Sequence, residues 1–275
     1  MRVLISADME GASGVTSSAE VRVGGPEWQE FRHLLTGDVN AAIEGFYEGG
    51  ATEIIVNEAH ATARNLVLAK LDARATVIRG RPKPLGMMEG IDSGIDALAF
   101  VGYHARAGAD GTLSHTYIAS GIVRLLLNGN DAGEGSLNAA LASEYGIPVA
   151  LVTGDDRACA EAALYAPAAC RVAVKRYIGR FAADCLAPVA SASRIREAAT
   201  RGLLSIEPPA PIGTPVTIEV EFATESAPSS ATAIPGVVRV GARTVRYTCP
   251  RMYDAYRCFK VLTVLAADAI DPTYG

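Results

Sequence analysis

Cysteine is scarce in this sequence, and its spacing carries no recognisable pattern. Only 5 of the 275 residues are cysteine, and no two of them follow a Cys-x-x-Cys spacing. An odd number without such pairs argues against both a disulfide framework and a thiolate zinc site. We therefore expect buried, reduced thiols. The residues concerned are Cys159, Cys170, Cys185, Cys249 and Cys258.

Long apolar runs and an excess of basic residues are also missing. No uninterrupted apolar stretch approaches the roughly 18 residues of a membrane helix. The first apolar segment is short and runs into the acidic Asp8 and Glu10, unlike a signal peptide. The net charge is −5, whereas nucleic-acid binders present a basic face. The sequence thus predicts a cytoplasmic protein with neither nucleic-acid nor membrane partners.

The hydrophobic pattern predicts an α/β protein with a mostly parallel sheet and helices on both faces. Short apolar segments alternate with segments of helical periodicity up to about residue 180. The predicted strands are 3–6, 54–56, 75–78, 97–101, 123–127, 148–153 and 170–174, and the predicted helices are 27–48, 135–145 and 157–164.

The last part of the chain has a different pattern. Residues 216–222 alternate apolar and polar side chains, which is typical of a half-exposed strand. The pattern of the residues that follow predicts a hairpin over 237–240 and 244–249. It predicts a closing helix over 254–268. Four prolines between residues 208 and 215 mark a boundary. We therefore expect an α/β catalytic domain over 1–207 and a smaller C-terminal α+β portion with antiparallel strands over 208–275, either separate or packed as part of one unit.

Imidazoles and carboxylates follow several of the predicted strands. Asp8 and Glu10 follow the first strand, His60 the second and His104 the fourth, while Glu134 lies between two glycines. Ligands bind at the carboxyl ends of strands in α/β sheets, so these five side chains are candidate metal ligands. Two histidines with three carboxylates suit zinc, or manganese as a harder metal. Five ligands exceed what one catalytic zinc usually takes, and two metals sharing a carboxylate would use them all.

His115 is a further candidate, in the Gly-rich loop after His104. It could be another ligand, a general acid or base, or a nucleophile. His33 lies within the predicted helix 27–48 and is expected to be a surface or packing residue. Asp155 and Asp156 are expected to cap the following helix, and Lys175 with Arg176 to be solvated.

At these residues the sequence closely resembles the D-aminopeptidase family of zinc metallopeptidases, of the dipeptide-permease-operon type. The family's opening Ser-x-Asp-x-Glu-Gly signature is matched by Ser6, Asp8, Glu10 and Gly11. The likeness continues in the same order over almost the whole chain. Further matches are Asn57 with His60, Gly102 to Ala105, Ser114 with His115, Gly133 with Glu134, Leu137 to Ala139, and Gly154 to Ala158. One departure is Glu58, where the family usually has Asp.

The resemblance implies a di-zinc site formed by Asp8, Glu10, His60, His104 and Glu134, with Asp8 bridging the metals. It implies that His115 is the catalytic residue. It also implies a decamer of two stacked five-membered rings that removes N-terminal D-residues from short peptides. Two alternatives stay open at this point: a metal-dependent amidohydrolase or phosphoesterase acting on a small metabolite, and a non-catalytic assembly or binding protein with a structural metal.

Overall fold

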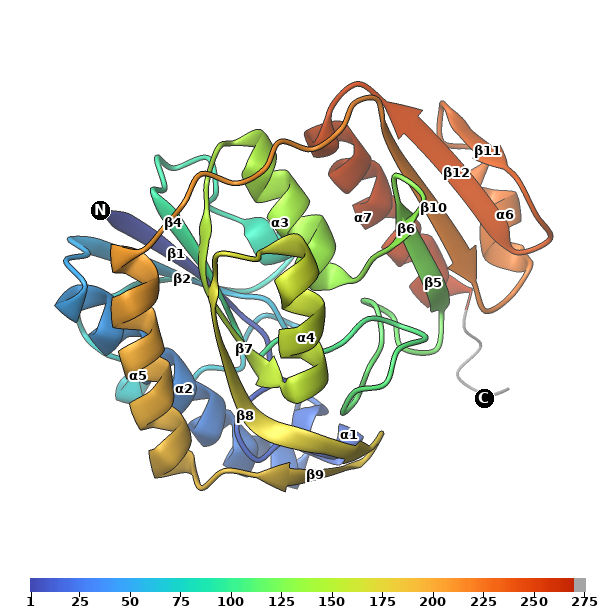
Figure 1. The fold of residues 1–275 in the computed structure, drawn as a ribbon. Helices are drawn as coiled ribbons and strands as arrows, with labels where there is room; N and C mark the ends of the chain where they lie inside the picture. Colours follow the sequence, from blue (N-terminus) through green and yellow to red (C-terminus); the bar gives the residue numbers. More distant parts are fainter. Residues whose placement is uncertain (270–275) are drawn as a thin grey trace.

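A computed structural model of the chain describes residues 1–269 and contains two sheets (Figure 1). Sheet A has seven strands in the order β3-β2-β1-β4-β7-β8-β9. All neighbours pair in parallel except β8 and β9, which pair antiparallel. The strands are β1 (Arg2–Ala7), β2 (Glu53–Glu58), β3 (Thr76–Ile78), β4 (Ala97–Val101), β7 (Val149–Asp155), β8 (Cys170–Gly179) and β9 (Ala182–Cys185). The predicted mostly parallel sheet is confirmed.

Helices cover both faces of sheet A because its central strands are apolar on both sides. Val3 and Ile5 of β1 belong to one buried cluster, together with α2 (Pro26–Glu48) and α5 (Pro188–Leu204). Leu4 belongs to another, together with α3 (Glu134–Glu144). Helix α4 (Asp156–Tyr165) lies beside α3 (Figure 1). A short helix, α1 (Ser18–Val21), interrupts the predicted loop after β1, and two 3-10 turns, η1 (Leu68–Lys70) and η2 (Gly86–Met88), lie in other loops.

Helix α5 lies where no element is predicted from the sequence. Its buried stripe consists largely of small residues, including Ala198, Ala199 and Gly202. Small residues let two helices approach closely. A Cβ on Gly45 of α2 would lie 2.1 Å from the carbonyl oxygen of Arg196. The contact between α2 and α5 therefore depends on backbone proximity.

Sheet B is antiparallel, with the strand order β11-β12-β10-β5-β6. Its strands are β5 (Ile122–Leu127), β6 (Asn130–Asp131), β10 (Val216–Phe222), β11 (Val237–Arg239) and β12 (Thr244–Cys249). Strand β10 alternates buried and half-buried residues as predicted. Strand β5 joins this sheet rather than sheet A, so sheet B takes strands from both sides of residue 207. The division into two domains at that residue stays a prediction.

Helix α7 (Met252–Asp268) connects the two sheets. It contacts α3 on one side and β10 and β12 on the other, and α6 (Ser226–Ala231) packs beside it near β11 and β12 (Figure 1). The apolar residues of α3, α7 and sheet B form one continuous buried cluster. The loop between β4 and β5, which carries His115, therefore passes from sheet A to sheet B beside α7.

The cysteines, His33 and the helices test three smaller predictions. Cys249 and Cys258 are buried, but Cys185 is exposed on the edge strand β9, so the expected burial is wrong for that residue. His33 is exposed on α2, as expected. Within residues 1–269, no helix combines the length and apolar character needed to cross a membrane.

Candidate metal centre

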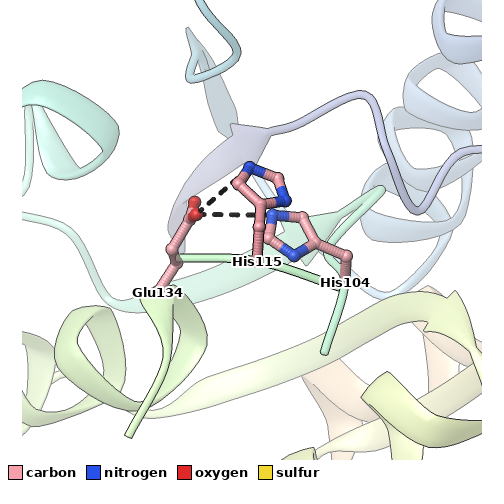
Figure 2. A group of neighbouring side chains, drawn as sticks. All are labelled: His104, His115 and Glu134. Atoms are coloured by element: carbon pink, nitrogen blue, oxygen red, sulfur yellow. Dashed lines mark ion pairs between the residues drawn. The ribbon is translucent and has the colours of Figure 1, made fainter. Parts of the chain in front are cut away.

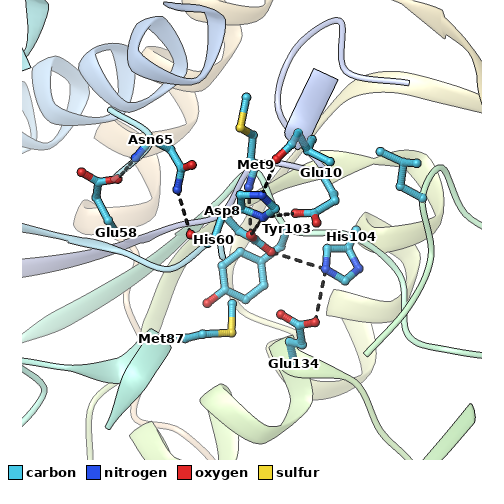
Figure 3. A network of polar contacts seen from close by, with 12 residues as sticks. Asp8, Met9, Glu10, Glu58, His60, Asn65, Met87, Tyr103, His104 and Glu134 are labelled. Carbon is cyan, nitrogen blue, oxygen red and sulfur yellow. Dashed lines mark hydrogen bonds and ion pairs between the residues drawn. The ribbon is translucent and has the colours of Figure 1, made fainter. Parts of the chain in front are cut away.

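The candidate ligands meet at one edge of sheet A because four of them follow three neighbouring parallel strands. Strand β1 lies between β2 and β4, and all three run in the same direction. Asp8 and Glu10 follow β1, His60 follows β2 and His104 follows β4. The carboxyl ends of these strands therefore deliver two carboxylates flanked by two imidazoles (Figure 3).

Two glycines allow the loops after β1 and β4 to interlock. The Gly11 N–H donates to the Gly102 carbonyl over 2.8 Å. A Cβ on Gly11 would lie 1.8 Å from the carbonyl oxygen of Tyr103, and a Cβ on Gly102 would lie 2.2 Å from that of Asp8. Gly102 also has a φ of +73°, which side chains disfavour. These positions therefore require glycine to bring His104 up to Asp8.

Glu134 and His115 reach the site from the side of sheet B. Glu134 is the first residue of α3, and its Oε1 accepts a hydrogen bond of 2.6 Å from the Tyr117 N–H. His115 lies two residues earlier in the same loop. Leu113 and Tyr117 both have positive φ angles, a strained arrangement that is common at functional sites. The loop is thus fixed to the carboxylate opposite it.

The ring nitrogens and carboxylate oxygens lie at the separations expected of ligands around shared cations. Asp8 faces both flanking imidazoles: Oδ1 lies 3.5 Å from His60 Nδ1, and Oδ2 lies 3.4 Å from His104 Nε2. His60 Nδ1 is also 2.9 Å from Glu10 Oε2, and His104 Nε2 is 3.4 Å from Glu134 Oε1. Two ligands about 2.1 Å from a tetrahedral zinc lie roughly 3.3 Å apart. Asp8 therefore lies within reach of two adjoining groups of candidate ligands, one on the side of His60 and one on the side of His104.

His115 lies beside His104 and Glu134 (Figure 2). The rings of His104 and His115 stack with centroids 4.0 Å apart. His115 Nε2 lies 3.9 Å from Glu134 Oε1 and 3.7 Å from Glu10 Oε1. One ligand atom each from His104, His115 and Glu134 lie within 4.8 Å of one another. His115 is thus close enough to act on anything held by the carboxylates.

Each of the three imidazoles uses one nitrogen for a backbone carbonyl. His60 Nε2 pairs with the Val21 carbonyl at 2.9 Å, His104 Nδ1 with that of Ala105 at 3.0 Å, and His115 Nδ1 with that of Leu113 at 2.8 Å. A carbonyl only accepts, so the proton of a neutral ring must lie on the nitrogen facing it. The other nitrogen then presents a lone pair to the carboxylates. This arrangement fixes the tautomer in the way that metal ligands require.

The charges of the site compensate one another only partly. Burial lowers the pKa of His60 and His104, but Glu10 beside His60 and Glu134 beside His104 outweigh it, so both pKa values lie well above the ordinary range. Burial raises the pKa of Glu10, yet the nearby His60 holds it well below its usual value. Asp8 Oδ2 and Glu10 Oε2 are buried without a hydrogen-bond partner. A divalent cation held by these oxygens and ring nitrogens would take the place of the protons that the raised pKa values describe.

Lys175 supports the loop that carries two of the candidate ligands. Its side chain is buried, and its ammonium donates to the carbonyls of Glu10, Ala12 and Val15 at 2.7, 3.0 and 2.5 Å. Burial lowers its pKa to about 8. The expectation of a solvated pair is therefore wrong for Lys175, while Arg176 is exposed. A bulge in the pairing of β7 with β8 sets Asp155 opposite Lys175, and residue spacing does not reveal such a bulge.

The remaining predicted residues position the site from outside it. Asp155 caps α4 through the Ala158 N–H, as predicted, and its other oxygen accepts from the Thr112 N–H at 2.6 Å. Asp155 thus anchors the loop of His115. Glu58 accepts hydrogen bonds from the backbone of Asn65, whose side chain donates to the His60 carbonyl at 2.8 Å. Glu58 therefore helps to hold the backbone of His60 in place through Asn65 (Figure 3).

The fold and the site together define a metallohydrolase-like α/β protein, with a cluster of carboxylates and imidazoles at a sheet edge. The chain belongs to the D-aminopeptidase family, whose profile it matches over residues 1–261. It is 35% identical to a D-aminopeptidase of Bacillus subtilis (strain 168) over 97% of this chain and 98% of that one. It also resembles the solved structure of the Zn-dependent D-aminopeptidase DppA from Bacillus subtilis, described as a self-compartmentalizing protease. The TM-score is 0.94 at 33% identity, over 98% of this chain and 100% of the other.

Proposed function

We propose that this protein is a di-zinc aminopeptidase that releases an N-terminal D-residue from short peptides. The observation that carries the proposal is the placement of Asp8 between two imidazoles, with one carboxylate oxygen toward each. A carboxylate in this position suits two cations at the separation of roughly 3.5–4 Å that is typical of two-metal hydrolases. Membership of the D-aminopeptidase family supports peptide hydrolysis at an N-terminus.

Two subsites would hold the metals. We assign His60, Glu10 and Asp8 to the first, and His104, Glu134 and Asp8 to the second. Zinc is favoured by the zinc dependence of the similar solved structure, and manganese or another divalent ion also suits this donor set. When bound, the metal pair would supply Lewis-acid activation of a water molecule and of the scissile carbonyl.

His115 would be the catalytic side chain. Its Nδ1–H is directed to the Leu113 carbonyl, so Nε2 is the free atom that faces the carboxylates. From there it would either accept and return a proton or attack the carbonyl carbon. The hydrogen bond from Thr112 to Asp155 and the one from Tyr117 to Glu134 keep the loop, and hence the ring, in place.

The proposed substrate has a free N-terminal amine and a small side chain of D configuration. The configuration rests on the family and on the similar D-aminopeptidase. Asp155 and Asp156 are acidic residues that could in principle accept a hydrogen bond from the substrate ammonium. Both oxygens of Asp155 already accept backbone N–H groups, and Asp156 accepts that of Tyr177 at 2.6 Å. Neither carboxylate is therefore assigned to the amine. The cytoplasmic location stays a prediction.

Self-assembly is the remaining part of the proposal. The similar solved protein is described as self-compartmentalizing, and we propose a homodecamer for this chain as well. Large apolar side chains are exposed on several elements here, including Leu164 on α4, Phe181 before β9 and Val189 on α5. Subunit contacts would cover such residues. Light scattering at micromolar concentration measures the mass, and a monomer would contradict the assembly.

One preparation tests the metal site and the reaction together. Protein purified without chelator should contain close to two divalent metals per chain, and Asp8→Ala should lower the occupancy of both because the shared carboxylate is lost. The zinc-loaded enzyme should cleave D-Ala amides and dipeptides in preference to their L forms, and should not cleave N-acetylated forms.

Each outcome separates a different alternative. Full metal content in the Asp8→Ala variant would contradict the shared ligand. Equal cleavage of acetylated substrates would instead indicate an amidohydrolase. Two metals without hydrolysis of any substrate would indicate a non-catalytic protein.

A further inference from the structure

Lys260 of α7 is a half-buried cation without a carboxylate partner in the described part of the chain. Its ammonium forms no hydrogen bond or ion pair within residues 1–269, and it lies over the ring of Tyr117, 4.9 Å from the ring centroid. A half-buried ammonium without such partners carries a desolvation cost that a bound anion would offset. The groups around the Lys260 ammonium therefore indicate which anion it could bind.

Lys260 lies at the rim of the candidate metal centre. Tyr117, over whose ring the ammonium lies, donates its backbone N–H to Glu134 at 2.6 Å. Tyr256, one helical turn before Lys260, shares its helix face and hydrogen-bonds the Tyr117 hydroxyl at 3.1 Å. This face of α7 therefore covers the loop that carries His115.

The second side of the rim is the loop before β4. A Cβ built on Gly86 would lie 2.8 Å from the Lys260 ammonium, so the cation rests against the backbone there. The Gly86 carbonyl accepts a hydrogen bond of 2.9 Å from Asn57, at the end of β2, three residues before His60. Lys260 thus lies between the loops that approach the two proposed metal subsites.

The charges around Lys260 favour an anionic ligand. Burial lowers its pKa, Glu134 raises it, and Arg81 lowers it again. Arg81 is exposed and also makes no ion pair within residues 1–269. The other cations near the site are in use: Lys83 donates to Asn57 Oδ1 at 2.5 Å, and Arg79 pairs with Glu58 at 3.3 Å. Two neighbouring cations without partners repel each other until an anion lies between them.

We propose that Lys260, assisted by Arg81, binds the free C-terminal carboxylate of a short peptide substrate. The inference rests on the proposed peptidase function and deepens it. In a dipeptide the carboxylate carbon lies only about 3–4 Å from the scissile carbonyl carbon, since a single N–Cα unit separates the two. A cation at the rim would therefore select short peptides whose far end carries a negative charge, and would discriminate against chains that continue.

A matched pair of substrates tests this assignment. D-Ala-Gly and D-Ala-Gly amide have the same scissile bond and differ only in the terminal charge. In Lys260→Met, which keeps the aliphatic stem, the ratio of kcat/KM for the acid to that for the amide should fall about 10- to 100-fold, the usual effect of losing a charge-assisted contact. The loss should appear mainly in KM of the acid, and Lys260→Arg should restore most of it.

The control is Lys70→Met, which removes the same charge from the exposed end of η1; its ratio should match that of the wild type. A ratio in Lys260→Met equal to that of the wild type would overturn the assignment, whether both activities fall by the same factor or neither changes. If the wild-type enzyme cleaved the amide but not the acid, the carboxylate site would be wrong while the proposed function stood. If it cleaved neither, the proposed function itself would fail, and the inference with it.

Discussion

The carboxyl edge of sheet A and the inner face of sheet B bury opposite kinds of side chain. At the edge of sheet A, Asp8, Glu10 and His104 are all less than a tenth exposed. Along β10 of sheet B, the buried positions are apolar, among them Ile218, Val220 and Phe222, and the alternate positions are polar. Buried ionisable groups are costly unless partners compensate them. The edge of sheet A therefore holds ionisable groups that serve a reaction or a ligand, whereas the inner face of sheet B holds apolar groups that stabilise the fold.

Replacing His115 should produce the largest effect and should leave stability nearly unchanged. His115→Ala removes a proton-transfer or nucleophilic group, so kcat/KM for D-Ala dipeptides should fall about 10²–10⁴-fold. Metal content by elemental analysis should stay at the wild-type level. The control is His33→Ala, on the exposed surface of α2. Loss of metal would instead identify His115 as a ligand, and an unchanged kcat/KM would remove it from the mechanism.

Replacing a core residue of sheet B should have the opposite signature. Phe222 is fully buried, and Phe222→Ala should lower the free energy of unfolding by about 3–5 kcal/mol. Activity per folded molecule should remain, because Phe222 belongs to the buried apolar cluster around sheet B and is not one of the candidate site residues. Glu221→Ala, on the outer side of the same strand, should cost less than about 1 kcal/mol. Chemical denaturation measures both, and equal losses would remove the distinction between the two faces.

The smallest expected effect concerns Asp38, a buried carboxylate of α2 behind the loop after β1. Burial raises its pKa to about 6, although it accepts hydrogen bonds of 2.8 Å from both the N–H and the hydroxyl of Ser13. Because the folded pKa lies above the unfolded one, this contribution to stability is complete below about pH 4 and is lost as the pH rises through 6.

Comparison of the wild type with Asp38→Asn isolates that contribution, since all other titrations are common to both. The stability of the wild type relative to the variant should decline between pH 4 and 6, by roughly 2–3 kcal/mol at most. Denaturant titrations at several pH values measure the decline. A constant difference would show that Asp38 does not titrate in this range.

The sequence predicts most of sheet A because buried parallel strands are continuous apolar segments, and the predicted strand 97–101 agrees with β4. It predicts β10 through simple alternation. It also predicts the assembly of Asp8, His60 and His104, because the ends of neighbouring parallel strands meet at one edge. It does not predict α5, whose buried stripe is made of small residues, or the sheet to which β5 belongs.

Other parts of the site depend on tertiary contacts that no local pattern records. Lys175 is directed inward beside a bulge, and its three acceptors are backbone carbonyls distant in sequence. Lys260 is one of many polar positions on a predicted helix, and its place at the site follows from how α7 packs. The family resemblance implies the proposed ligand set and the proposed role of His115, but not these supporting residues.

The path of the chain through the two sheets also sets an order for folding. Strand β5 pairs with β10, and Leu127 pairs with Ile218, although the strands β6 to β9 and three helices lie between them in the sequence. Contacts between distant segments form slowly because a long loop must close first. On a ribosome, β1, β2 and β4 are synthesised well before β10 and α7. The loop of His115 therefore gains its final support only when α7 docks. An incompletely synthesised chain should bring Asp8, His60 and His104 together before the proposed catalytic residue, His115, is held in place.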